Sequence, residues 1–329
     1  MGDATRTRWA RAFAEAAHRH WTPERTREVA GDKRLAILPG DAPLLLRALG
    51  LLHRDATMPP PQVRKFLQIN HMVGLLARTL DELTARHDEV RLLDAGCGRS
   101  YLTLLVAWCA RRDGRRVAVL GVDRNPEVIA ECRRRCELAE LDDVVRFEAG
   151  ALGELDVSAA WQRAFAATST VPSGAPSGAP SGAPSAAPSG PIQGVFALHA
   201  CDTATCDAIA LGVRTGAELI AVAPCCQAEL ARAWSERASA RDGAFAPIHR
   251  TPHLRRELAA HLTDAMRVLL LRAAGYATTP MEFIADAHTK KNTLIRAVRA
   301  TPDPSARAEY DALVGATGGC GLALADRIS

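Results

Sequence analysis

The feature that most constrains the fold of this chain is a regular alternation of short apolar runs and helical segments. Seven runs of strand length share this pattern: residues 90–93, 116–122, 144–148, 194–198, 218–222, 281–285 and 293–298. Helical periodicity lies between them, most clearly over residues 100–110, 126–139 and 254–274. Strands that alternate with helices build a mainly parallel sheet with helices on both faces. The sequence therefore predicts an α/β protein with a Rossmann-like, doubly wound sheet of seven strands.

The chain divides into regions of different composition. Residues 1–61 predict a basic helical appendage, with helices over 8–19 and 42–53, that ends at a run of three prolines. Residues 62–300 carry the alternating pattern, and residues 301–329 follow as a C-terminal tail. Residues 172–191 repeat Pro, Ser, Gly and Ala, with no apolar side chain large enough to form a core. We expect this insert to be a disordered excursion on a surface loop.

Charge and cysteine content bear on location and partners. The polar N-terminus lacks the apolar segment of a secretory leader, and no apolar run is long enough to span a bilayer. Nine cysteines, an odd number, favour reduced thiols, so we expect a soluble, cytoplasmic protein. Residues 1–65 hold 12 Lys and Arg against 7 Asp and Glu, whereas the remainder is almost balanced. This basic front end indicates either a polyanionic partner or an ordinary solvated helical face.

A glycine-rich turn follows the first predicted strand. Asp94, Gly96 and Gly98 lie at the carboxyl end of that strand, where open α/β sheets bind ligands, and glycine lets the backbone approach a ligand closely. Asp123 ends the next strand, where a carboxylate can accept both hydroxyls of a ribose. Tyr101 replaces the third glycine of a dinucleotide motif, and Asp94 would repel a pyrophosphate. An ammonium and a sulfonium suit these acids better, which predicts S-adenosylmethionine as the cofactor.

These residues, with several further segments, resemble a known family. Asp94-x-Gly96-x-Gly98 with Asp123 is similar to the first two motifs of class I methyltransferases. The additional segments are 65–71, 198–205, 223–227, 262–267 and 288–296. Together they resemble the bacterial methyltransferase family related to the Trm13-type tRNA 2′-O-methyltransferases and to the methyltransferase-like domain of glutathione S-transferase C-terminal domain-containing proteins. The likeness covers residues 62–299 without the insert.

The resemblance implies a cofactor site built from residues between positions 65 and 149. Asp94, Gly96 and Gly98 would line the methionine end of the cofactor, and Asp123 would bind the ribose. The other predicted cofactor contacts are Lys65 and Gln68 over the amino-acid end, Ser100 and Arg124 beside the two motifs, and Glu148 and Ala149 near the adenine.

Five polar residues follow the fourth and fifth strands, where the topology places them toward the transferable methyl group. They are His199, Cys201, Asp202, Cys225 and Cys226. His199 or Asp202 could orient or deprotonate an oxygen or ring-nitrogen acceptor. Alternatively, a cysteine could attack a pyrimidine as a nucleophile, or the thiols and a histidine could hold zinc, or these residues could simply pack beside the cofactor. We predict no metal. The motif typical of exocyclic amine methylation, Asn/Asp-Pro-Pro-Tyr/Phe, is absent.

The acceptor class is suggested by charge. Lys290 and Lys291 lie between the last two predicted strands, and would border the active site if strand 281–285 runs parallel to the others. With the basic N-terminal helix and the resemblance, they favour RNA, either rRNA or tRNA, as the partner. A small-molecule methyltransferase and a non-catalytic S-adenosylmethionine-binding module are the alternatives. We expect no membrane contact, and the sequence implies no stable protein partner.

Overall fold

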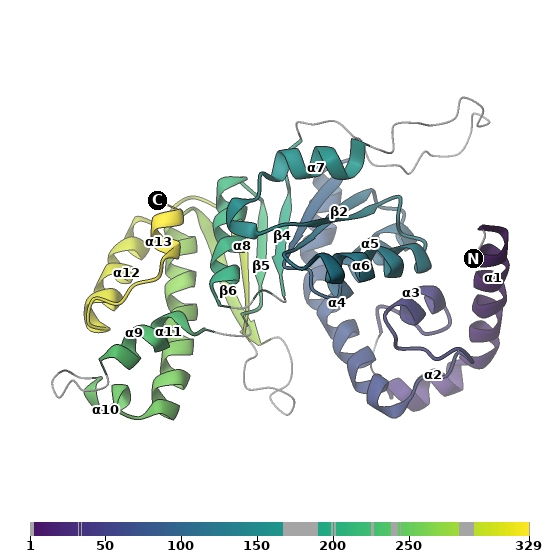
Figure 1. Ribbon diagram of the computed structural model, residues 1–329, viewed down its shortest axis with the longest axis horizontal. Coiled ribbons are helices and arrows are strands. Elements are labelled where there is room, and N and C mark those ends of the chain that lie inside the picture. Colours follow the sequence, from purple (N-terminus) through teal and green to yellow (C-terminus); the bar gives the residue numbers. More distant parts are fainter. Residues whose placement is uncertain are drawn as a thin grey trace. The chain divides into compact units, whose positions relative to one another are not determined.

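The computed structural model of the chain contains a seven-stranded mixed sheet in the order β3-β2-β1-β4-β5-β7-β6 (Figure 1). It describes residues 3–31, 33, 35–166, 190–198, 200, 202–224, 227–237, 243, 245–282 and 293–328. The strands are β1 (Val90–Ala95), β2 (Val117–Asp123), β3 (Val145–Ala149), β4 (Gly194–Ala197), β5 (Leu219–Val222), β6 (Tyr276–Glu282) and β7 (Thr293–Arg299). Pairs β2–β3, β1–β4 and β4–β5 are parallel, and β7 is antiparallel to both neighbours. The predicted fold class is confirmed.

The chain forms two compact units, whose limits differ from the boundary at residue 61 that composition suggested. The first comprises Met1–Arg91, Cys97–Gly150 and Asp156–Ser189, and the second comprises Leu92–Gly96, Ala151–Leu155 and Gly190–Ser329. Helices of the first unit are α1 (Asp3–His20), α2 (Pro23–Ala30), α3 (Pro43–Ala48), α4 (Pro60–Arg86), α5 (Tyr101–Arg112), α6 (Pro126–Leu138) and α7 (Val157–Ala166).

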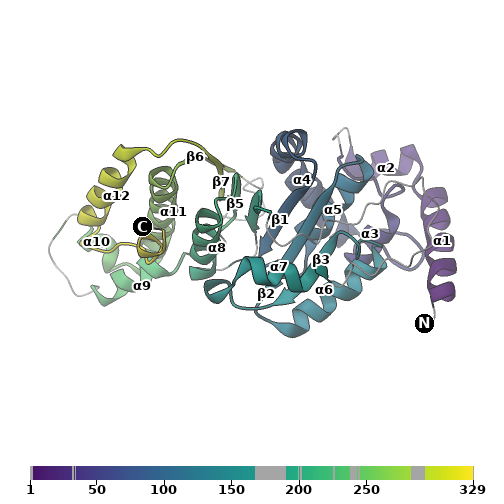
Figure 2. The ribbon, with the colours of Figure 1, turned by 90° about the horizontal axis from the view of Figure 1, so that it is seen from above.

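The N-terminal helices share the core of the first unit. Leu45 and Leu46 on α3 are fully buried, and α3 packs against α1, α5 and α6 (Figure 2). The Trp21 indole N–H donates to the Ala56 carbonyl at 2.8 Å, and the Asn70 side-chain oxygen accepts the Ile37 N–H at 2.8 Å. The Asn70 bond and the leucine packing tie residues 1–59 to α4, α5 and α6, so the predicted N-terminal helical region packs within the first unit.

The second unit extends to the end of the described chain. Its helices are α8 (Thr203–Arg214), α9 (Glu229–Glu236), α10 (Ala246–His249), α11 (Pro252–Ala273), α12 (Pro304–Ala316) and α13 (Leu324–Arg327), with a 3₁₀ turn, η1 (Leu152–Glu154). The segment expected to be a tail forms α12 and α13. Tyr310 is buried where α12 packs along α11, and the Thr317 carbonyl accepts the Trp234 indole N–H at 3.2 Å. Among the residues that the structure describes, no helix combines the length and apolar character needed to cross a membrane.

The prediction for Lys290 and Lys291 depended on the strand before them running parallel to the other strands, and β6 does so. Since β7 is antiparallel to β5 and β6 is antiparallel to β7, β6 runs parallel to β5. Its carboxyl end at Glu282 therefore lies at the same edge of the sheet as the ends of β4 and β5. The strand begins at Tyr276, five residues before the predicted start, because most of its side chains are exposed and form no apolar run. Lys290, Lys291 and residues 172–189 lie outside the described residues.

Close packing around β2 generates a stability prediction. A Cβ added at Gly121 would stand 2.6 Å from Cδ1 of Phe147 and 3.2 Å from Sγ of Cys97. We expect Gly121→Ala to lower the free energy of unfolding by about 1–3 kcal/mol, because the ring must move within a packed core. Urea denaturation measures this change.

The matched control is Gly74→Ala on α4, where nothing lies within 4 Å of the added methyl group. Alanine should stabilise this helix position by about 0.8–1 kcal/mol relative to glycine. Two variants of equal stability would contradict the packing described for β2.

Candidate functional site

The turn after β1 uses left-handed backbone at alternate residues. Gly96, Gly98 and Ser100 have φ values of 76°, 50° and 56°. A Cβ on Gly96 would approach the Cβ of Ala200 to 3.3 Å within the second unit, so glycine is needed there for both conformation and space. Ser100 is fully buried, and its Oγ has no hydrogen-bond partner among the described residues. The turn therefore combines left-handed backbone with one buried hydroxyl whose hydrogen-bonding capacity is unused among the described residues.

Asp123 is held at the carboxyl end of β2 by backbone donors. Its Oδ2 accepts the Gly98 N–H at 3.1 Å, and its Oδ1 accepts the Asn125 N–H at 2.9 Å. Each oxygen keeps a further lone pair, and the residue is partly exposed, so two ribose hydroxyls can donate to it. The β2–β3 register pairs Asp123 with Ala149, which places both side chains on the same face of the sheet. These residues fit the ribose and adenine of the predicted cofactor.

Glu148 faces the other side of the sheet, because successive strand residues alternate. Its carboxylate pairs with Arg163 on α7, whose Nε lies 3.1 Å from Oε1. This side chain is thus engaged by α7, and a contact of Glu148 with adenine stays a prediction. Arg124 is exposed at the start of the loop after β2.

Lys65 reaches the start of α5 from α4, within the first unit. Its Nζ donates to the Tyr101 hydroxyl at 2.5 Å and lies 3.8 Å from the centre of that ring. The Tyr101 hydroxyl in turn donates to the Leu49 carbonyl at 3.0 Å. Because Tyr101 follows Ser100 directly, the structure brings Lys65 next to the turn. Gln68, one helical turn later, is exposed.

Asp94 belongs to the part of the turn in the second unit. It is 2 % exposed, at the position of β1 that pairs with Phe196 of β4. A carboxylate so nearly buried favours a cationic group nearby.

Of the five predicted methyl-transfer residues, the structure describes Asp202. His199, Cys201, Cys225 and Cys226 lie outside the described residues. The Asp202 carboxylate accepts the N–H groups of Ala228 and Glu229, at 2.9 and 3.2 Å, and pairs with Arg232 at 2.5 Å. Burial acts to raise the pKa of Asp202, but the Arg232 contact and the backbone donors outweigh it and lower the pKa. The carboxylate is therefore a weak base, and it ties the segment after β4 to α9.

A buried polar cluster that sequence reasoning did not identify lies beneath Asp202. Arg267 of α11 is fully buried, and its Nη1 donates to the Asp264 carboxylate at 3.0 Å. Its Nη2 lies 3.0 Å from the Asp202 carbonyl oxygen and 3.4 Å from Sγ of Cys206. The Gln227 side-chain amide donates to Asp264 at 2.9 Å. The sequence contained one indication of this ion pair: Asp264 and Arg267 are three residues apart on a predicted helix, a spacing at which side chains meet.

The Arg267 cluster joins α11 to the segments that follow β4 and β5. Burial raises the pKa of Asp264, although the contacts with Arg267 and Gln227 act to lower it. Two buried atoms of the cluster, Nε of Arg267 and Oε1 of Gln227, have no hydrogen-bond partner among the described residues. Because Gln227 follows Cys225 and Cys226 directly, the cluster fixes the end of the segment that carries those thiols.

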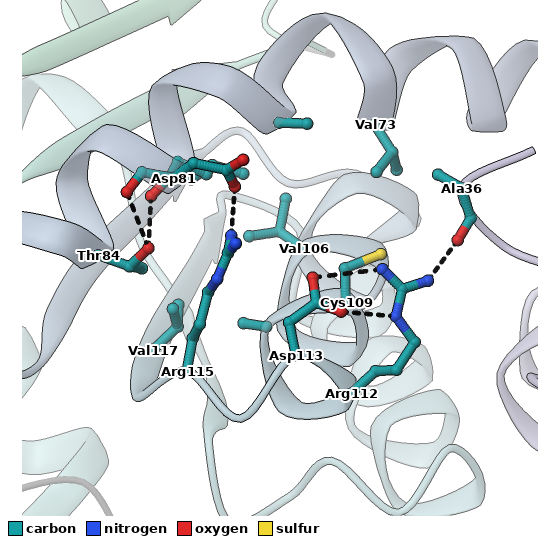
Figure 3. Close-up of a pocket in the computed structure, with 13 residues that line it drawn as sticks. Ala36, Val73, Asp81, Thr84, Val106, Cys109, Arg112, Asp113, Arg115 and Val117 are labelled. Carbon is teal, nitrogen blue, oxygen red and sulfur yellow. Dashed lines mark hydrogen bonds and ion pairs between the residues drawn. The ribbon is translucent and has the colours of Figure 1, made fainter.

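A small cavity in the first unit is a separate feature (Figure 3). It measures about 90 Å³ and is lined mainly by apolar side chains of α4 and α5, with Arg115–Asp81 and Arg112–Asp113 ion pairs at its rim. Burial raises the pKa of Cys109 in its wall to about 11. Ligand pockets usually measure about 300–1,000 Å³, so this cavity is too small for the cofactor. Within the described ranges, no cluster of three or more His, Cys, Asp and Glu could hold a metal ion.

The geometry agrees with a comparison against known families. A family model described as a methyltransferase domain matches residues 64–233, more than half of the chain. The chain belongs to this family. It is an S-adenosylmethionine-dependent methyltransferase, with S-adenosylmethionine as its cofactor. The matched residues include the turn after β1, Asp123 and Asp202. The closer relationship to Trm13-type enzymes stays a prediction.

Solved structures resemble the methyltransferase at low sequence identity. Cofactor-bound Rv0187 from MTB is 16% identical, with 80% of this chain and 92% of that chain covered and a TM-score of 0.40. Magnesium protoporphyrin IX methyltransferase from Synechocystis PCC 6803 with bound SAH is 12% identical, with 74% and 89% covered and a TM-score of 0.41. An rRNA methylase from Streptococcus thermophilus is 11% identical, with 70% and 97% covered and a TM-score of 0.36. No curated protein matches the chain.

The role of Asp123 can be tested by calorimetry with S-adenosylmethionine. Asp123→Ala removes the acceptors for the ribose hydroxyls, at about 1–3 kcal/mol for charge-assisted bonds, so we expect affinity to fall about 10- to 100-fold. The control is Asp113→Ala at the far end of α5, where the carboxylate pairs with Arg112. Unchanged affinity in a folded Asp123 variant would refute the proposed ribose contact.

The lowered pKa of Asp202 predicts a pH-dependent contribution to stability. The ionised carboxylate stabilises the fold, so its contribution is present above the ordinary pKa of 3.8 and is lost as pH falls through the lower folded pKa. We expect Asp202→Asn to cost about 1–2 kcal/mol at neutral pH, and the difference from wild type to shrink toward pH 3. Denaturant titration across this range measures it.

For comparison, Asp311→Asn removes an exposed pair with Arg307 and should cost under about 1 kcal/mol at every pH. A cost for Asp202→Asn that stays constant down to pH 3 would argue against the ionised pair.

Proposed function

We propose that this methyltransferase modifies RNA, either rRNA or tRNA, at a ribose oxygen or a ring nitrogen. The observation that supports this acceptor most directly is the arrangement of α1. Its arginines at positions 6, 8, 11 and 19 are exposed, whereas Ala10, Phe13 and Ala17 are buried. The helix thus packs through an apolar stripe and turns cationic side chains to solvent. A helical face that only contacts water needs no excess of positive charge, whereas a face that binds a phosphate backbone does.

The proposed chemistry divides the work between cofactor and protein. S-adenosylmethionine supplies an activated methyl group on its sulfonium. On this proposal, Asp94 and the turn at 96–100 hold the methionine end, and Asp123 holds the ribose. The acceptor loses a proton as its bond to the methyl carbon forms, which calls for a nearby base. Asp202 is a weak base because Arg232 holds it ionised, so we assign proton acceptance to His199.

The thiols at 201, 225 and 226 keep two roles in this proposal. They pack beside the transferable methyl group, or one of them acts as a covalent nucleophile toward a pyrimidine. The loop with Lys290 and Lys291 follows β6 at the edge of the sheet where β4 and β5 end. Lys290 and Lys291 follow the end of β6 in the sequence, and on this proposal they make a second contact with the RNA.

The experiment that tests the acceptor class uses purified protein, labelled S-adenosylmethionine and either total RNA or the small-molecule fraction of the same cells. We expect label in RNA, and nucleoside mass spectrometry then identifies the base or ribose position. A deletion strain should lack the same modified nucleoside. Labelling confined to the small-molecule fraction would establish the small-molecule enzyme instead. Cofactor binding without transfer to either fraction would indicate a non-catalytic module.

A further inference from the structure

The first unit contains an arginine-lined hollow between α1, α3 and α6, defined by Arg6, Trp9, Arg47, Arg54 and Arg134. We call it the arginine hollow. It measures about 470 Å³, within the range of binding sites for small ligands or nucleotides. Three segments far apart in the sequence supply its walls, and α3 packs against both α1 and α6. Of these three segments, the sequence indicated α1 alone as a binding element.

Cationic side chains outnumber acidic ones in the lining of the arginine hollow. Four guanidinium groups line it, and the acid among its lining residues is Glu137, whose carboxylate lies 4.0 Å from Arg6 and is half exposed. Arg47 uses one N–H on the Leu52 carbonyl, at 2.9 Å. Arg134 pairs with the Glu131 carboxylate on α6, through its Nε at 3.0 Å and its Nη2. A guanidinium carries five donors and stays charged at all working pH values, so one that pairs with a carboxylate can also bind a second anion. Such a set of planar donors suits phosphate oxygens.

Trp9 adds an aromatic surface to the same hollow. Its ring stacks on Phe13, with centroids 5.4 Å apart and an interplanar angle of 14°. Phe13 is buried and covers one face of the indole, and Trp9 remains partly exposed. A rigid, supported aromatic ring among cations is the combination that proteins use to bind single-stranded nucleic acids, with bases stacked and phosphates paired.

A second hollow adjoins the first through shared arginines. It measures about 460 Å³, shares Arg47 and Arg54 with the first and adds His53 and Asp55. Two hollows joined by shared arginines favour an extended ligand with repeating charges over a single small anion.

We propose that the arginine hollow binds a single-stranded segment of the RNA substrate, with phosphates on its arginines and a base stacked on Trp9. This inference rests on the proposed RNA function and extends it to a named site. Arg134 and Glu137 lie in the last turns of α6, whereas Asp123 precedes its first turn. At 1.5 Å per residue, Glu137 is about 16 Å along the helix from Pro126. The hollow therefore docks the substrate and does not take part in methyl transfer.

Fluorescence anisotropy with a labelled single-stranded RNA of mixed sequence, at several salt concentrations, tests the proposal. Arg54→Ala with Arg134→Ala should reduce the salt slope of log K by about 1.4, which corresponds to two phosphate contacts on a single strand. Trp9→Ala should weaken binding about tenfold, and Trp9→Phe should restore most of it. Affinity for S-adenosylmethionine should be unchanged in every variant, which also verifies folding.

The charge-matched control is Arg78→Ala with Arg307→Ala. Both residues are exposed arginines that pair with an acid four residues away on their own helices. Equal RNA binding by this control and the hollow variant, with wild-type RNA binding intact, would overturn the hollow and leave the RNA function standing. If wild type shows no salt-dependent RNA binding, the RNA function itself fails. Anionic lipid vesicles that bind the protein where RNA does not would likewise overturn the proposal.

Discussion

The turn between β1 and α5 is the constraint on which the first unit depends. Two consecutive backbone groups of this turn donate to the end of β2: the Cys97 N–H to the Val122 carbonyl at 2.9 Å, and the Gly98 N–H to the Asp123 carboxylate. The same strand must stay free of a side chain at Gly121, where Phe147 and Cys97 occupy the space. The position of Asp123, the start of α5 and the packing of β3 thus follow from one short segment of backbone.

The sequence predicted most reliably the elements whose burial leaves a pattern. The central strands are buried along nearly their whole length, so they read as apolar runs, and their ends were placed to within two residues. At β6 the prediction was five residues late, because an exposed edge strand does not need apolar residues. The helices after residue 301 were missed for a related reason: α12 packs through Ala306 and Tyr310, too few apolar positions to show helical periodicity.

The parts of the candidate site that depend on backbone conformation could be predicted from the sequence, and the parts that depend on helix packing could not. Gly96, Gly98 and Asp123 could be found because the turn demands glycine and the strand end exposes one acid. The contacts of Lys65 with Tyr101, and of Glu148 with Arg163, depend on how α4 and α7 pack, and no local pattern encodes that. The same limit applies to the arginine hollow, whose cations come from α1, α6 and the segment of α3 with the turn that follows it, which lie far apart in the sequence.

In the second unit, paired charges hold the segments that follow β4 and β5 in place. A guanidinium cannot give up its charge inside a protein, so the buried Arg267 requires an anion, and the ionised Asp264 carboxylate supplies it. Such a buried pair adds little net stability compared with apolar packing, but losing one partner leaves an uncompensated charge. The pair also holds the Asp202 carbonyl and, through Gln227, the segment after β5. The Asp202 carboxylate binds Arg232 and two backbone N–H groups. The charged groups described next to these segments are therefore committed to holding the segments in place.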